Sequence, residues 1–293
     1  MVKTKPEVKP KEQRCAPDKI FENNSCIPLH VLVEMAKAYN RKFKNSPIKL
    51  YRDVEILNPG KYKEYLVKQF GRDNILGKVC NDQLCWILEG KDFIKNMKKK
   101  EKQELLKQTF RPKGPEGKFD WLSTYNIDNV MKQYEKKYPE FKYLGAVPID
   151  FDDLPQYGIK NLDFDDLLKK GKSKLGLIFN LDEHDKSGSH WVALYADISK
   201  GEIYFFDSYG TNPEKRIRKF MRRINNYCIK KLKKRHIIIE RANTVQHQQG
   251  GNACGVYSLN FIIQILEGTS FDEIINQKTR DKEMNIHRQI YFT

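Results

Sequence analysis

The feature that most constrains this chain is a loop rich in Gln and Gly that runs directly into a long apolar stretch. The loop, residues 248–255, contains Gln-Gln-Gly-Gly-Asn-Ala-Cys-Gly, and the apolar run extends from Val256 to Leu266. The run has the composition of a buried helix. Cys254 therefore stands where a helix begins, and there unpaired N–H groups and the helix dipole stabilise a thiolate. The pattern predicts a reactive thiol at the edge of a folded core.

A predicted hairpin lies upstream of this loop. Its strands are 190–197 and 202–207, and residues 199–201, Ser-Lys-Gly, form the turn. His190 opens the first strand and Asp207 closes the second, so the antiparallel register places both at one end of the sheet. Asp207 can then bind one ring nitrogen of His190 and leave the other to face a thiol.

A thiol, an imidazole and a carboxylate in these settings indicate a cysteine protease. Each residue alone also fits a structural role, and only the combination favours catalysis. His184, in an acidic loop, is a competing base that we expect to be solvated. The backbone N–H of Cys254 can donate to an oxyanion, and Gln248 or Gln249 can supply a second donor.

The chain divides into two halves of different character. The first half reads as mostly helical, with helices expected over 29–43, 62–70 and 93–108. Residues 110–117 are rich in Pro and Gly and predict a linker. The second half combines a helix capped by Asp128, strands at 174–181 and 237–239, the hairpin and the apolar helix, which indicates an α+β fold. We therefore expect a flexible lead-in at 1–26, a helical N-terminal module at 27–115 and a catalytic domain at 116–293.

The charge of the chain is strongly positive, at +16, and it is concentrated in one segment. Residues 213–235 are predicted to form an amphipathic helix with a basic outer face. A solvated surface and a docking site for nucleic acid fit this face equally well. No apolar stretch is long enough to span a membrane, and the first residues do not resemble a secretory signal. We expect an intracellular protein in a reducing environment.

Six cysteines are spread along the chain. Cys15, Cys26, Cys80 and Cys85 could together bind zinc, but their spacing is poor for such a site, and buried free thiols are the favoured interpretation. We therefore expect no metal.

Several short motifs carry a family resemblance. His190-Trp191, Asp207-Ser208 and Gln248 followed by Cys254-Gly255 resemble elements of the ubiquitin-like-protein protease and adenovirus protease (adenain) superfamily. The order along the chain agrees. A closer resemblance is to the polyprotein-processing proteases of African swine fever virus and related large DNA viruses. It is carried by the N-terminal module and by residues 110–115, 125–128 and 188–193. The resemblance implies a central mixed sheet flanked by helices.

The resemblance also implies roles for individual residues. Cys254 would be the nucleophile, His190 the general base and acid, and Asp207 the residue that orients His190. Gln248 is preferred to Gln249 for the oxyanion hole because the family's Gln stands six residues before its Cys. The family's narrow cleft for Gly-Gly corresponds to Trp121 and Trp191, with the small Gly251 beside it as a further substrate-binding position.

The function expected is an endopeptidase that matures viral structural polyproteins at Gly-Gly-X sites, in the virion and the host cytoplasm. No cofactor would be required, although DNA could stimulate the enzyme, as it does the adenoviral relatives. Three alternatives stay open: a deconjugating isopeptidase for ubiquitin-like proteins, an acetyltransferase with a similar triad, and a non-catalytic DNA-binding virion protein.

Overall fold

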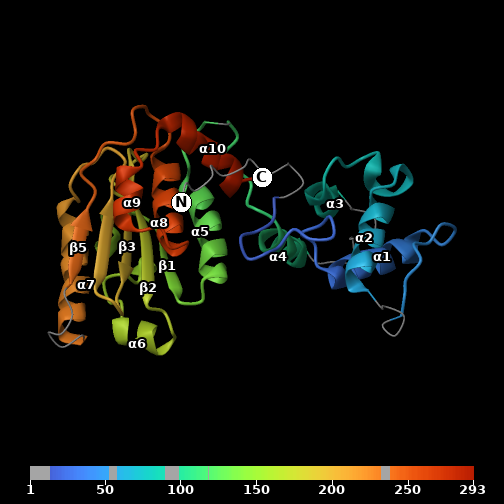
Figure 1. Cartoon of the computed structure of the whole chain (residues 1–293), viewed down its shortest axis with the longest axis horizontal. Coiled ribbons are helices and arrows are strands. Elements are labelled where there is room, and N and C mark those ends of the chain that lie inside the picture. Colours follow the sequence, from blue (N-terminus) through green and yellow to red (C-terminus); the bar gives the residue numbers. More distant parts are fainter. Residues whose placement is uncertain (1–13, 53–57, 90–98, 118, 232–237) are drawn as a thin grey trace. The chain divides into compact units, whose positions relative to one another are not determined.

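A computed structural model describes residues 14–52, 58–89, 99–117, 119–231 and 238–293 of the chain. These residues form two compact units that divide between Pro112 and Lys113, with Thr293 belonging to the first (Figure 1). Each unit has hydrophobic core residues of its own. The division falls inside the segment, 110–117, that the sequence indicates as a linker.

The first unit is helical. Its α-helices are α1 (Leu29–Lys42), α2 (Pro59–Phe70), α3 (Gln83–Glu89) and α4 (Lys99–Thr109). They enclose a core that includes Leu32, Leu66, Phe70 and Trp86. The predicted helices at 29–43 and 62–70 are confirmed, whereas α3 was not foreseen. The predicted helix at 93–108 is seen from Lys99 onward, and its earlier part lies outside the described residues.

The first unit also contains two disulfide bonds. Cys15 is bonded to Cys26 and Cys80 is bonded to Cys85. The prediction that these four cysteines are buried free thiols is therefore wrong, and their sulfurs are not available as a zinc ligand set. Disulfides are typical of proteins that meet an oxidising environment, whereas a reducing one was expected from the sequence.

The second unit is built on a five-stranded mixed sheet in the order β1-β2-β3-β4-β5. The strands are β1 (Phe141–Pro148), β2 (Lys174–Asn180), β3 (Trp191–Asp197), β4 (Glu202–Phe206) and β5 (Ile239–Ala242). The central strands β2, β3 and β4 pair antiparallel, and the outer pairs β1–β2 and β4–β5 are parallel. The predicted α+β class with a mixed sheet is confirmed.

Helices cover both faces of this sheet (Figure 1). One face packs against α5 (Thr124–Lys137), α8 (Cys254–Leu266), α9 (Phe271–Asn276) and α10 (Asp281–Tyr291). The other face packs against α6 (Phe164–Lys169) and α7 (Lys215–Lys231). Side chains of β3 alternate between the two cores, with Ala193 and Tyr195 on the α8 side and Val192 and Leu194 on the α7 side. Burial on both faces fixes the register of the strand that leads out of His190.

Two features of this unit differ from the sequence-based expectation. Strand β1 was not foreseen, although it pairs in parallel with β2 at the edge of the sheet. The cap of α5 is Ser123, which forms a reciprocal capping box with Asn126. Asp128 lies inside the helix instead, and its carboxylate accepts hydrogen bonds from the Tyr143 hydroxyl and the Ala146 N–H.

The basic helix predicted at 213–235 is present as α7. It begins at Lys215 and ends at Lys231, and residues 232–237 lie outside the described part of the chain. Strand β5 starts at Ile239, later than the predicted strand at 237–239. Among the described residues, no helix is both long and apolar enough to cross a membrane.

Gly176 of β2 supplies a test of the packing between β1 and β2 on the face of the sheet that α8 covers. A Cβ added at Gly176 would stand 2.6 Å from the ring of Phe141, which is fully buried. We expect Gly176→Ala to lower the free energy of unfolding by about 1–3 kcal/mol through overpacking. Because Leu lacks the ring atoms that clash, Phe141→Leu combined with Gly176→Ala should cost clearly less than the sum of the two single changes. Urea unfolding of the four proteins measures this, and strict additivity would contradict the proposed contact.

Candidate active site

The hairpin brings a histidine and an aspartate together at one end of the sheet. His190 immediately precedes β3, and Asp207 immediately follows β4. Their side chains meet, with Nε2 of His190 2.7 Å from Oδ1 of Asp207. The same carboxylate oxygen accepts the N–H of Tyr209 at 2.9 Å, and the Tyr209 ring lies over the imidazole with centroids 4.9 Å apart. The strand ends thus fix the positions of both members of the predicted pair.

Cys254 is the first residue of α8, and its side chain is buried. The Cys254 thiol interacts with the His190 imidazole, and this interaction contributes to raising the pKa of His190. Because Asp207 occupies Nε2, the ring nitrogen left for the thiol is Nδ1. Asp207 is thus hydrogen-bonded to the imidazole of His190, and the Cys254 thiol interacts with the same ring.

The electrostatics of this group favour a charged imidazole. Burial lowers the pKa of His190, but its hydrogen bonds with Asp207 and Cys254 outweigh burial and raise the pKa to about 9. Burial raises the pKa of Asp207, but the hydrogen bonds from His190 and the Tyr209 N–H prevail and lower it. An imidazolium beside a thiol at the start of a helix is a setting that promotes a thiolate.

Gln248 is fully buried beside the hairpin end. Its side-chain oxygen accepts the Ser208 hydroxyl at 2.7 Å, and its side-chain nitrogen donates to the carbonyl of Gly250. The side-chain amide is therefore oriented with its nitrogen toward the loop that precedes Cys254. One of the two amide protons is sufficient for Gly250, so the second can serve another acceptor.

Two tryptophans line an open cavity of about 430 Å³. Trp121 is partly exposed, and its indole N–H donates to the Asn252 side chain at 2.7 Å. Trp191 is buried, and its indole N–H donates to the Leu122 carbonyl at 2.9 Å. Each ring is therefore held in place by the hydrogen bond of its indole N–H. A cavity of this volume can receive a short stretch of peptide.

The glycines of the loop differ in what surrounds them. A Cβ at Gly251 would meet no atom within 4 Å, so the chain's own packing does not require a glycine there. A Cβ at Gly255 would lie 3.0 Å from Leu122, the residue that anchors Trp191. Close approach between α8 and the tryptophan segment therefore depends on Gly255.

The competing base His184 belongs to a different pair. Its Nδ1 lies 2.5 Å from Oδ2 of Asp150, and this contact raises the pKa of His184. The side chain is exposed and lines the wall of the cavity. His190, not His184, contacts Cys254.

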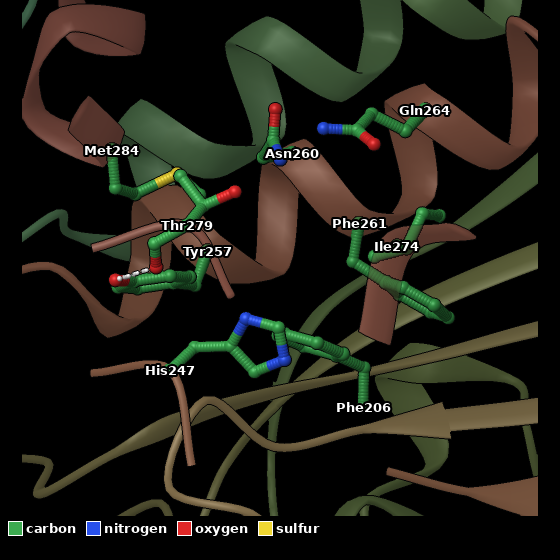
Figure 2. Close-up of a pocket in the computed structure, with 9 residues that line it drawn as sticks. All are labelled: Phe206, His247, Tyr257, Asn260, Phe261, Gln264, Ile274, Thr279 and Met284. Atoms are coloured by element: carbon green, nitrogen blue, oxygen red, sulfur yellow. Dashed lines mark hydrogen bonds between the residues drawn. The ribbon is translucent and has the colours of Figure 1, made fainter. Parts of the chain in front are cut away.

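A second, smaller cavity is lined by His247 together with side chains of α8, α9 and α10, among others (Figure 2). It has a volume of about 10 Å³, which suits one water molecule and no peptide. The buried Nε2 of His247 lies among its lining residues and has no hydrogen-bond partner in the described part of the protein. Burial lowers the pKa of His247. No group of three or more metal-ligating side chains is found among the described residues.

Several residues of the site were not predicted from the sequence. Tyr209 covers His190, and Asn252 holds Trp121. Asp281 and Arg288, both on α10, contact the loop that precedes Cys254. Tyr209 and Asn252 stand next to motifs found in the sequence, and this position was the signal that could have identified them. Asp281 and Arg288 bind main-chain atoms, and such contacts leave no recognisable motif in the sequence.

Comparison with known proteins is consistent across sequence and structure. Residues 170–292 match the Ulp1 protease family, C-terminal catalytic domain. A thiol protease candidate of Acanthamoeba polyphaga mimivirus is 39% identical over 95% of this chain and 92% of its own. A SUMO-1 cysteine protease of African swine fever virus is 28% identical over 61% of this chain and 70% of its own. The crystal structure of an African swine fever virus protease matches with a TM-score of 0.63 and 21% identity over 97% of both chains, which shows a shared fold.

The raised pKa of His190 makes stability depend on pH. Below the ordinary value of 6.5 the imidazole is charged in the folded and the unfolded chain, so its stabilisation is fully present. The stabilisation is lost as pH rises from 6.5 through about 9. We expect the free energy of unfolding to fall by about 1–3 kcal/mol across this window and His190→Gln to flatten the dependence. Urea titrations near both ends of the window measure this; an equal slope in both proteins would show that His190 is not responsible.

Proposed function

Because this chain belongs to the Ulp1-like family of cysteine proteases and is a viral-type thiol protease, we propose that it cleaves polyproteins after Gly-Gly through a Cys254–His190–Asp207 triad. The observation that carries the proposal is the position of His190, whose Nε2 lies 2.7 Å from the carboxylate of Asp207 and whose electrostatics include the Cys254 thiol, so that Nδ1 is the nitrogen left for the sulfur. An imidazole that is oriented by a carboxylate and faces a thiol is the arrangement in which the imidazole exchanges a proton with the sulfur.

The residues account for each step of peptide hydrolysis. The Cys254 sulfur attacks the scissile carbonyl carbon, and protonated His190 donates its proton to the leaving amine. The resulting thioester is then attacked by water, whose proton passes to His190 and then to the sulfur as the carboxylic acid leaves. Asp207 holds the ring orientation and stabilises its charge throughout.

The negative oxygen of the tetrahedral intermediates needs preorganised donors. The backbone N–H of Cys254, at the N-terminus of α8, is one candidate, and the Gln248 amide is the second. Because Ser208 fixes the side-chain oxygen of Gln248, the amide cannot rotate to present the oxygen to a negative charge. This favours Gln248 over the neighbouring Gln249 as the oxyanion donor.

The preference for glycine follows from the walls of the cleft. Trp121 and Trp191 are both held by hydrogen bonds through their indole nitrogens, so neither ring can swing aside freely. A substrate backbone that passes between rigid rings fits best without side chains, which only glycine provides. Gly251, whose surroundings are open, leaves room for the segment on the loop side.

Maturation of structural polyproteins in the virion is the role we favour. Among the alternatives, membership of a protease family removes the non-catalytic DNA-binding protein. A deconjugase would act by the same chemistry on a folded ubiquitin-like protein, and the choice of substrate separates the two. An acetyltransferase would transfer an acyl group from acyl-CoA instead of hydrolysing a peptide.

A fluorogenic peptide with Gly-Gly before the scissile bond tests this proposal. We expect the unmodified enzyme to release the fluorophore and Cys254→Ala to lower the rate at least about a thousandfold, because the nucleophile is lost. Cys228→Ala is the matched control, since Cys228 is the other free cysteine, is buried and has a pKa raised to about 11 by burial. Cys228→Ala should retain activity.

Substitution of alanine for either glycine of the peptide should reduce kcat/KM more than about tenfold. If the enzyme hydrolyses a folded ubiquitin-like conjugate but leaves the Gly-Gly peptide intact, the polyprotein proposal is replaced by the deconjugase.

The outer face of α7 favours an accessory interaction with nucleic acid. Three of its basic residues pair with carboxylates on neighbouring segments, namely Arg216 with Glu183, Arg223 with Asp152 and Lys231 with Asp165. Five further basic side chains are exposed along the same helix: Lys215, Arg218, Lys219, Arg222 and Lys230. Their spacing forms one stripe, which matches the repeating charge of a phosphate backbone.

Charge reversal on this stripe tests the interaction. We expect double-stranded DNA at low salt to bind the protein and to change the peptide-cleavage rate at least about twofold, with both effects falling steeply as salt rises. The triple variant R218E/K219E/R222E should lose both effects. Lys132→Glu, on α5 at the opposite face of the sheet, should keep them. Salt-independent binding, or equal responses of the two variants, would count against the α7 stripe.

A further inference from the structure

The C-terminal helix α10 carries two charged side chains that reach toward the active-site loop. Asp281 is the first residue of the helix, and Arg288 follows seven residues later, which is about two turns along the same face. Both contact the segment 249–252, which lies directly before Cys254. Neither residue belongs to the triad or to the oxyanion hole.

Asp281 holds the start of this segment. Its Oδ2 accepts the backbone N–H of Gln249 at 3.0 Å and that of Gly250 at 2.7 Å. Its Oδ1 lies 3.0 Å from the hydroxyl of Tyr257, which also donates to the Thr279 carbonyl, as Figure 2 shows. Since Gly250 in turn accepts the Gln248 amide, the position of Asp281 determines where the proposed oxyanion donor points.

Arg288 joins the segment that precedes Trp121 to the loop that precedes Cys254. The side chain is almost fully buried, and its three nitrogens are all engaged: Nε with Asn285, Nη1 with the Asp120 carbonyl and Nη2 with the Asn252 carbonyl. Asp120 precedes Trp121, whose indole also donates to Asn252. One guanidinium therefore ties the tryptophan wall to the loop of the nucleophile.

Arg288 is also a positive charge close to the reactive sulfur. Burial lowers its pKa, while the charges of Cys254 and Asp120 raise it. A guanidinium stays protonated in proteins, and its described hydrogen bonds here go to neutral oxygen atoms. Burial of a charge without a hydrogen-bonded carboxylate is costly, which argues that the position serves more than packing.

We propose that Asp281 and Arg288 are positioning residues for the protease reaction, Asp281 for the oxyanion loop and Arg288 for the substrate wall and the charge beside Cys254. This inference rests on the proposed function. The two residues have separable effects. Asp281 acts on groups needed in the transition state, so its loss lowers kcat. Arg288 also acts on Trp121, so its loss changes KM as well.

Kinetics of three variants and a control test this division. We expect Asp281→Asn to lower kcat about tenfold with KM changed less than about twofold, and Arg288→Gln to lower kcat/KM about a hundredfold through both constants. Arg288→Lys, which keeps the charge, should recover part of the loss. Lys282→Gln removes an exposed charge from the same helix and should behave as the unmodified enzyme.

Two measurements need no turnover. Hydrogen exchange of the amides of Gln249 and Gly250 should accelerate at least about tenfold in Asp281→Asn and not in Lys282→Gln. Alkylation of Cys254 by iodoacetamide at neutral pH should slow at least about threefold in Arg288→Gln and recover in Arg288→Lys. If the unmodified enzyme cleaves no peptide, the proposed function fails, while exchange and alkylation still decide the roles of Asp281 and Arg288. Unchanged exchange and alkylation in folded variants would overturn the inference.

Discussion

The main-chain carbonyl of Ser208 accepts hydrogen bonds from two successive amides, those of His247 and Gln248, and the Ser208 hydroxyl donates to the side chain of Gln248. Its neighbour Asp207 holds His190 through a buried carboxylate. The two residues that follow β4 therefore fix the imidazole on one side and the oxyanion loop on the other. Because β4 is paired on both edges, with β3 and β5, the sheet sets the position of this junction. The geometry of the whole site depends on it.

Much of the catalytic unit could be read from the sequence because its signals are local. The apolar run after Cys254 and the hairpin between His190 and Asp207 each follow from periodicity within a few residues. The meeting of His190 with Asp207 followed from hairpin register alone. The approach of His190 to Cys254 was a hypothesis that only the three-dimensional arrangement of β3, β4 and α8 could test.

The features that escaped prediction depend on partners far away in the sequence. Strand β1 contains Gly145, with a φ of +123° at an irregularity in its pairing, and ends at Pro148, so its pattern resembles a loop until β2 pairs with it. Asp128 looks like a helix cap, yet it binds Tyr143 and Ala146 in that strand. Arg288 bonds to main-chain carbonyls, which every residue carries, so no sequence pattern could identify its partners.

The disulfides of the N-terminal unit impose a condition on the enzyme as a whole. Cys254 must stay reduced to act as a nucleophile, while the bonds Cys15–Cys26 and Cys80–Cys85 exist only when oxidised. A thiol reagent that is added to keep Cys254 reduced attacks both disulfide bonds by thiol–disulfide exchange. The nucleophile of this chain therefore needs reducing conditions, whereas its disulfide bonds need oxidising ones. A higher concentration of reductant favours catalysis by Cys254 and at the same time breaks the bonds that hold the N-terminal unit.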